Sequence, residues 1–263
     1  MLLDTLEWGS HHAAADRIVC IHGLTQHAGV YSQLGEQQAA HGQAVLAVSL
    51  RGHGGSGVNP PWSLGTHVDD VLETIREAGI ERATIVGHSF GGIVAAALAA
   101  KAPREVDALA LLETPGRLPP QHALRAIEIE RLDWSFATIE GAIEAMMSGD
   151  VMTRPPRDVV TAFVKDDVRR GPDGRYRFRF SRGASVVAWN EMTMQPPEIA
   201  NLPTLLVRAA SPLVDVSERT HEYEATLGDQ LTMVEVPNGH NVLWEAPTET
   251  LSAVDSFIKE VRG

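Results

Sequence analysis

Short apolar runs alternate along the chain with longer segments in which apolar residues recur at helical spacing. Helical spacing predicts helices near residues 30–41, 66–79, 90–102, 215–227 and 248–261. The short runs are bounded by Gly, His and Pro, which favours strands buried on both faces. They are Ile18–Ile21, Ala44–Leu50, Ala83–Val86, Ala108–Leu112, Leu205–Val207 and Leu231–Val236. Alternation of this kind predicts an α/β protein with a mostly parallel sheet flanked by helices, to which Leu2–Trp8 adds an antiparallel edge strand.

The alternation is interrupted between Arg117 and Pro197. Helical patterns continue there near residues 121–133, 138–148, 156–168 and 184–192, with a polar, Arg-rich stretch at 169–182 and no buried strand. We therefore expect one core made of residues 1–116 and 198–263, and a helical lid inserted at residues 117–197.

Length and charge narrow the possibilities further. A chain of 263 residues is long enough for one sizeable core with a small insertion. The net charge of −12 disfavours nucleic acid and anionic membranes as partners. The single cysteine, Cys20, excludes an intrachain disulfide and fits a reducing compartment. With no basic leader and no membrane-length apolar run, we expect a cytoplasmic protein, and a homodimer remains open.

The strongest local signal for chemistry is Gly87-His88-Ser89-Phe90-Gly91. It follows a predicted strand and precedes a predicted helix, which is the context of a nucleophile elbow. The turn is so tight that the residues two before and two after the serine must be small, and Gly87 and Gly91 meet that need. The pattern indicates that Ser89 is a nucleophile.

Two further segments join this elbow in carrying a family resemblance. Three segments resemble, in this order, those of the α/β-hydrolase superfamily. They are His22-Gly23-Leu24-Thr25, Arg51–Gly57 (RGHGGSG) and Gly87–Gly92 (GHSFGG). The likeness is to its lidded esterase, lactonase and C–C hydrolase branch. The resemblance implies that the backbone amides of Leu24 and Phe90 form an oxyanion hole and that no cofactor is needed.

A histidine late in the chain could accept the proton of the Ser89 hydroxyl. His240 lies in a turn, Pro237–Asn241, after the last predicted strand, where it matches the general base of the family. The chain has 11 histidines, so this position, and not the residue type, supports the assignment. The sequence contains no His-Glu-x-x-His motif and no cysteine cluster, so we expect no catalytic metal.

The acid of the triad departs from the common pattern. Where the family usually has its aspartate, after the strand Leu205–Val207, this chain has Ser211, and Asp215 follows four residues later. Glu113 ends the strand Ala108–Leu112, at the same sheet edge as Ser89. Haloalkane dehalogenases and the fungal zearalenone lactonase carry their acid at a similar place. We favour Glu113 over Asp215, with a salt bridge from Glu113 to the insertion as the structural alternative.

These residues predict a serine hydrolase that cleaves a small carboxylic ester, with a lactone of hydrophobic body as the favoured substrate. Trp189 of the insertion and His53 of the Gly-rich loop are the predicted substrate contacts. A C–C bond hydrolase and a cofactor-free perhydrolase would use the same triad and remain alternatives. A receptor-like member that binds a small ligand without turnover is the alternative from another class.

Overall fold

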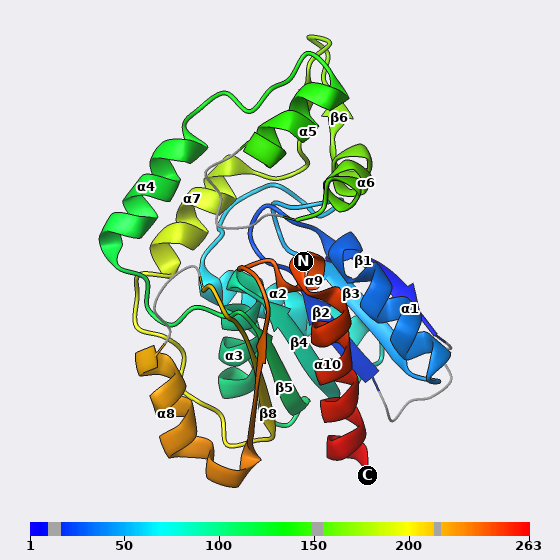
Figure 1. Ribbon diagram of the computed structural model, residues 1–263, viewed down its shortest axis with the longest axis vertical. Coiled ribbons are helices and arrows are strands. Elements are labelled where there is room, and N and C mark those ends of the chain that lie inside the picture. Colours follow the sequence, from blue (N-terminus) through cyan, green and yellow to red (C-terminus); the bar gives the residue numbers. More distant parts are fainter. Residues whose placement is uncertain (10–16, 149–154, 213–216) are drawn as a thin grey trace.

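A seven-stranded sheet forms the centre of the computed structural model, which describes residues 1–9, 17–148, 155–212 and 217–263 (Figure 1). The strand order is β1-β3-β2-β4-β5-β8-β9, and all neighbours are parallel except β1 against β3. The predicted α/β fold and antiparallel edge strand are thus confirmed. The strands are β1 (Asp4–Trp8), β2 (Arg17–Ile21), β3 (Ala44–Ser49), β4 (Ala83–His88), β5 (Val106–Leu112), β8 (Thr204–Ala209) and β9 (Leu231–Val236).

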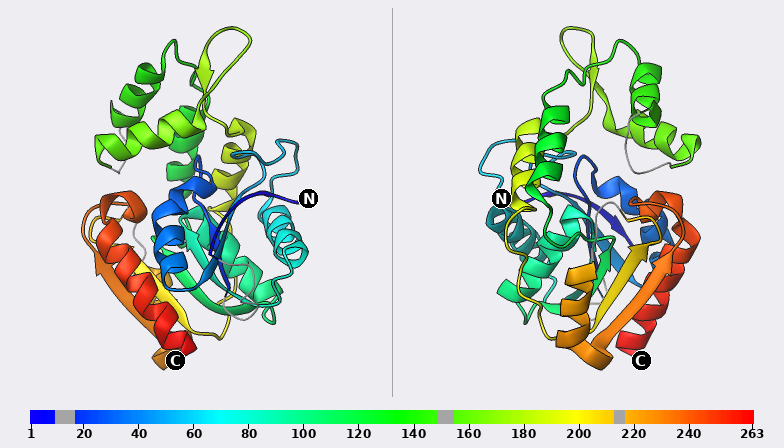
Figure 2. Two further views of the ribbon diagram at one scale, coloured as in Figure 1. Left: turned by 90° about the vertical axis from the view of Figure 1, so that its right-hand side faces the viewer. Right: turned by 60° about the vertical axis from the view of Figure 1, so that its left-hand side comes forward.

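Helices cover both faces of this sheet (Figure 2). One face carries α1 (Ser32–Ala40) and α10 (Pro247–Arg262), and the other carries α2 (Leu64–Glu77), α3 (Phe90–Lys101) and α8 (Ser217–Leu227). Every residue of β3 and β4 is therefore buried, which explains why these strands are uninterrupted apolar runs in the sequence.

Local capping shifts the helix ends away from the predicted ones. The side chain of Ser63 accepts a hydrogen bond from the amide of Thr66 at 3.3 Å, so α2 begins two residues before the predicted start. The side chain of His27 caps a 3₁₀ turn, η1 (Ala28–Tyr31), that precedes α1. Residues 215 and 216 of the predicted helix at 215–227 lie outside the described residues. The short helices α9 (Val242–Glu245) and η2 (Gly228–Gln230) were not predicted.

Residues 117–197 are called the inserted segment below, and their helices and strands lie beyond the carboxyl ends of the sheet strands (Figure 1). The amide of Gly54, in the loop after β3, donates to the backbone oxygen of Arg179, and the amide of Ser181 donates to that of Gly52. Where the sequence predicted only a polar stretch, β6 and β7 form a small antiparallel hairpin. The elements of the segment are α4 (Pro120–Glu130), α5 (Ile139–Ser148), α6 (Arg157–Asp167), β6 (Arg169–Arg170), β7 (Tyr176–Arg177) and α7 (Arg182–Glu191).

Among the helices within the described ranges, none combines the length and the apolar character that a bilayer crossing requires.

Candidate active site

Ser89 stands at the junction of β4 and α3 in strained backbone. Its φ and ψ are 52° and −122°, a region that residues with a side chain rarely occupy. A Cβ at Gly91 would overlap the backbone oxygens of Ile21 and His22, so only glycine fits there. The helix that follows directs its free amides and partial positive charge toward Ser89. The structure thus places Ser89 in the geometry that the elbow motif predicts.

His240 faces the serine directly. Its Nε2 lies 2.9 Å from Oγ of Ser89, a hydrogen-bond distance, although the two residues are 151 positions apart in the chain. The imidazole is largely buried, and it is held at the end of the turn that follows β9. Nε2 is therefore positioned to accept the hydroxyl proton of Ser89.

Glu113 lies on the other side of the imidazole. Its Oε1 is 3.8 Å from Nδ1 of His240, within ion-pair range but longer than a hydrogen bond. Its Oε2 accepts a hydrogen bond of 2.7 Å from the amide of Ala209, at the end of β8. The residue is only 4% exposed, and its backbone is left-handed, with φ of 43°. Catalytic hydrogen bonds are often longer in the free enzyme than in the reacting complex, and Glu113 needs to move by less than about 1 Å to bond Nδ1.

The structure does not describe the other candidate acid of the triad. Asp215 lies outside the described residues. Ser211, which takes the place of the usual aspartate, is exposed and donates its amide to the backbone oxygen of Asn238 at 3.0 Å. Among the described carboxylates, Glu113 is the one that an ion pair joins to His240.

The loop of residues 22–27 passes beside the serine, and it is called the oxyanion loop below after the role that the sequence predicts for the amide of Leu24. A Cβ built on Gly23 would lie 3.1 Å from the Cβ of Ser89, so the loop passes close to the serine at Gly23. His22 supports the loop: its Nε2 accepts from the amide of Leu50 at 2.8 Å, and its Nδ1 lies 2.6 Å from the oxygen of Gly23. Burial holds the pKa of His22 well below its usual value, so the ring is neutral. It therefore donates through Nδ1 and accepts through Nε2.

The model of the α/β hydrolase fold family matches residues 16–247 of this sequence, most of the chain. The chain belongs to the α/β hydrolase fold family. Lipase LipV of Mycobacterium tuberculosis is 30% identical to this family member over 250 residues, which are 91% of this chain and 92% of LipV. An esterase of the same bacterium is 26% identical over 264 residues, 96% of this chain and 85% of that protein.

Solved structures repeat the same fold. The crystal structure of E-2-(acetamidomethylene)succinate hydrolase superposes with a TM-score of 0.84 and 23% sequence identity, over 98% of this chain and 95% of that one. An esterase from a marine microorganism superposes with a TM-score of 0.80 at 18% identity, over 97% and 99% of the two chains. At these identities the likeness shows the fold, and the substrate of this family member has to be argued from its site.

The two predicted substrate contacts have different surroundings. His53 is 1% exposed: its Nε2 accepts from the amide of Thr25 at 3.3 Å, and its ring stacks on Phe180. Its side chain is thus occupied by the protein itself, and we reassign His53 from the substrate surface to the support of the oxyanion loop. Trp189, on α7, is half-buried and packs against the apolar core that contains Phe90. Trp189 stays a proposed contact.

Some polar partners of these candidate site residues were not identified from the sequence. Gln26 accepts from the amide of Gly23 at 3.1 Å and donates to Oδ1 of Asn241 at 2.8 Å, which joins the oxyanion loop to the residue after His240. Nε2 of His88 lies 3.0 Å from the backbone oxygen of His240. These polar residues lie in or next to the HGLT, GHS and GH segments. That position was the signal in the sequence from which they could have been identified. In the part of the chain that the structure describes, His, Cys, Asp and Glu form no group of three that could hold a metal ion.

Proposed function

We propose that this protein hydrolyses carboxylic esters through an acyl-enzyme formed on Ser89. The observation that carries the proposal is the 2.9 Å distance between Nε2 of His240 and Oγ of Ser89, with the serine held in positive-φ backbone at a strand-to-helix turn. A base within hydrogen-bond distance of a serine hydroxyl held in strained backbone is the arrangement of an activated serine. The lipase and esterase names of the relatives support the same class of substrate.

In the first half-reaction, Oγ of Ser89 adds to the ester carbonyl while Nε2 of His240 accepts the hydroxyl proton. The bond to the alcohol then breaks, and His240 returns the proton to the departing alkoxide. In the second half-reaction, His240 takes a proton from water, whose oxygen adds to the acyl carbon. The acid is released when Oγ leaves and regains its proton.

The negative charge that develops on the carbonyl oxygen is to be held by the amides of Leu24 and Phe90. Phe90 is the first residue of α3, so its amide has no partner within the helix and the helix dipole adds to its effect. Each donor of this kind contributes about 3 kcal/mol to the stabilisation of the transition state.

Glu113 is the proposed acid of the triad. During catalysis His240 becomes an imidazolium, and a buried carboxylate 3.8 Å from Nδ1 both stabilises that charge and selects the tautomer with the proton on Nδ1. The neutral tautomer leaves Nε2 free to accept the proton of Ser89. The hydrogen bond from the amide of Ala209 keeps the carboxylate at this position.

We extend the proposal to lactones with a hydrophobic body. The inserted segment acts in it as a lid, and Trp189 of α7 supplies apolar surface against the same core cluster that Leu24 contacts. The position of Glu113 after β5 resembles that of the acid in zearalenone lactonase, which also favours a cyclic ester. In a lactone the acid and the alcohol stay in one molecule, so the same steps open the ring.

The test compares wild type with Ser89→Ala on p-nitrophenyl esters of increasing acyl length and on a series of lactones followed by acid release. We expect turnover by wild type and its loss in Ser89→Ala. Ser252→Ala, which alters an exposed serine on α10, is the matched control and should keep full activity. A fluorophosphonate should label wild type and the control but not Ser89→Ala. Equal turnover by wild type and Ser89→Ala on every substrate would refute ester hydrolysis.

A further inference from the structure

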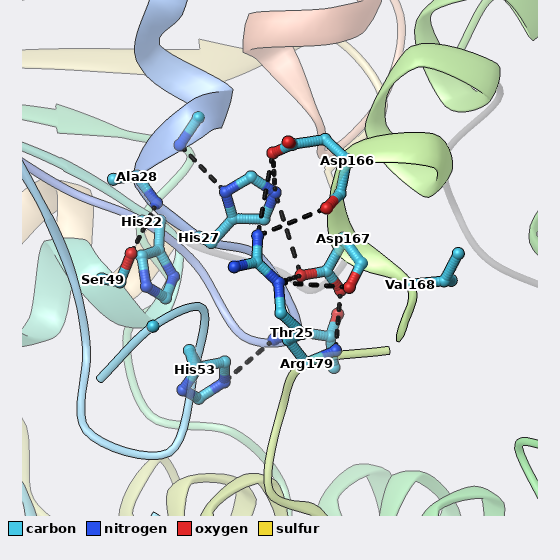
Figure 3. Close-up of polar contacts among 12 residues, drawn as sticks. His22, Thr25, His27, Ala28, Ser49, His53, Asp166, Asp167, Val168 and Arg179 are labelled. Carbon is cyan, nitrogen blue, oxygen red and sulfur yellow. Dashed lines mark hydrogen bonds and ion pairs between the residues drawn. The ribbon is translucent and has the colours of Figure 1, made fainter. Parts of the chain in front are cut away.

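A group of ionisable side chains, with His27 and Asp167 buried and Asp166 exposed, lies between the oxyanion loop and the inserted segment. Figure 3 shows the imidazole of His27 facing the carboxylates of Asp166 and Asp167, with the guanidinium of Arg179 beside them. Nε2 of His27 lies 3.4 Å from Oδ2 of Asp166 and 3.9 Å from Oδ1 of Asp167. His27 closes the oxyanion loop, whereas the other members belong to the inserted segment, so the group connects two parts that are far apart in the chain.

The protonation of His27 follows from its contacts. Its Nδ1 accepts a hydrogen bond of 3.1 Å from the amide of Gly29, so in the neutral ring the proton is on Nε2 and points to the two carboxylates. Burial lowers the pKa of His27, while Asp167 and Asp166 act in the opposite direction. The ring is stacked on Phe163 of α6, with centroids 5.1 Å apart, which fixes its orientation.

Asp167 is the most buried carboxylate of this group. It is 2% exposed at the end of α6, where Oδ2 accepts a hydrogen bond of 3.1 Å from the amide of Arg179 and Oδ1 lies 3.5 Å from Nε of the same residue. A buried carboxylate is stable only when such partners surround it. Asp167 therefore holds Arg179 by both its backbone and its side chain, and it also faces His27.

Arg179 connects Asp167 to the residues that contact Thr25 of the oxyanion loop. Its backbone oxygen accepts from the amide of Gly54, and the next residue, Phe180, stacks on His53. Nε2 of His53 in turn accepts from the amide of Thr25, whose left-handed φ of 59° has to be imposed by its surroundings. Two of the residues that follow Leu24 thus lead back to Asp167. Thr25 does so through His53, Phe180 and Arg179, and Nε2 of His27 faces Asp167 across 3.9 Å, longer than a hydrogen bond.

We propose that Asp167 is a positioning residue that acts through His27 and Arg179 to hold the Leu24 amide in place for catalysis. The inserted segment then completes the oxyanion hole in addition to covering the substrate. The expected effect on kcat rests on the proposed function, whereas the expected effect on the order of the loop does not. Oxyanion donors act mainly in the transition state, so a loosened loop lowers kcat and leaves KM nearly unchanged.

The test uses Asp167→Asn, which keeps the size of the side chain and removes its charge, and His27→Gln as an independent variant. For p-nitrophenyl butyrate we expect each variant to lose about tenfold in kcat with KM within about twofold, and to bind a trifluoromethyl ketone correspondingly more weakly. The double variant should lose no more than Asp167→Asn alone, because that change already interrupts the route through His27. Asp173→Asn removes an exposed carboxylate of the same segment, paired with Arg177, and is the matched control.

Hydrogen exchange supplies a readout that does not depend on turnover. Peptides covering residues 22–31 should exchange faster in Asp167→Asn and His27→Gln than in wild type, and at the wild-type rate in Asp173→Asn. Unchanged exchange in both folded variants would overturn the proposal, and so would a rise in KM with constant kcat. If wild type shows no ester turnover, the proposed function fails while the exchange result still decides the role of Asp167.

Discussion

Buried histidines around the active site should make the free energy of unfolding fall at mildly acidic pH. Burial lowers the pKa of His53 and of His67 to about 4, and that of His88 to about 3. Each ring is enclosed by the fold: His67 meets Phe90 edge to face, and His88 lies between Gln26 and His240. These rings are neutral in the folded protein across the range in which an unfolded histidine gains its proton.

The sign and size of the effect follow from these values. An unfolded histidine has a pKa of about 6.5. Below that pH the unfolded chain therefore binds protons that the buried rings of the folded protein do not bind. The free energy of unfolding is therefore fully retained above pH 6.5 and falls as the pH drops toward the folded values near 4 and 3. At pH 5 each of the three rings accounts for about 2 kcal/mol, or about 6 kcal/mol together. Single domains are stable by about 5–15 kcal/mol, so this loss is large.

The assay is urea unfolding followed by tryptophan fluorescence at pH 7, 6 and 5. We expect the free energy of unfolding to fall steeply between pH 6 and 5. In His67→Gln the difference between pH 7 and pH 5 should shrink by about 2 kcal/mol, because the contribution of that ring is gone. His122→Gln, which replaces an exposed histidine on α4, should show the wild-type difference. A free energy that stays constant from pH 7 to 5 would refute the reasoning.

Three further experiments test the site and the core. Glu113→Gln should lower kcat by roughly 10³- to 10⁴-fold on ester substrates, with little effect from Asp215→Asn, and the reverse pattern would move the triad acid to Asp215. Gly91→Ala should lower the melting temperature sharply, because its Cβ would overlap the backbone oxygen of Ile21, and an unchanged melting curve would contradict that geometry. Burial raises the pKa of the Cys20 thiol, so a thiol reagent should label it only in denaturant; rapid labelling of the native protein would be inconsistent with its burial.

The class of fold was predictable because its signals are local. Strands such as β3 and β4 are covered on both faces, and that environment produces apolar runs that can be recognised without knowing their neighbours. The hairpin of β6 and β7 was not predicted, because its strands have two residues each, and three of these four residues are exposed arginines. Its one local signal was Pro172-Asp173-Gly174, a turn sequence whose glycine has φ of 79°.

The sequence by itself determined which residues reach the carboxyl edge of the sheet. Ser89 and Glu113 end neighbouring parallel strands, and His240 follows the last one, so the topology brings them to the same edge. Only the tertiary structure decided the contacts there, such as Ser89 with His240 at 2.9 Å and Glu113 with the amide of Ala209. The physical reason is that strand and turn patterns arise from neighbours in the chain, whereas hydrogen bonds across 96 or 151 positions depend on packing that no local pattern records. His53 shows the difference: its motif suggested a substrate contact, and its packing against Phe180 made it a support.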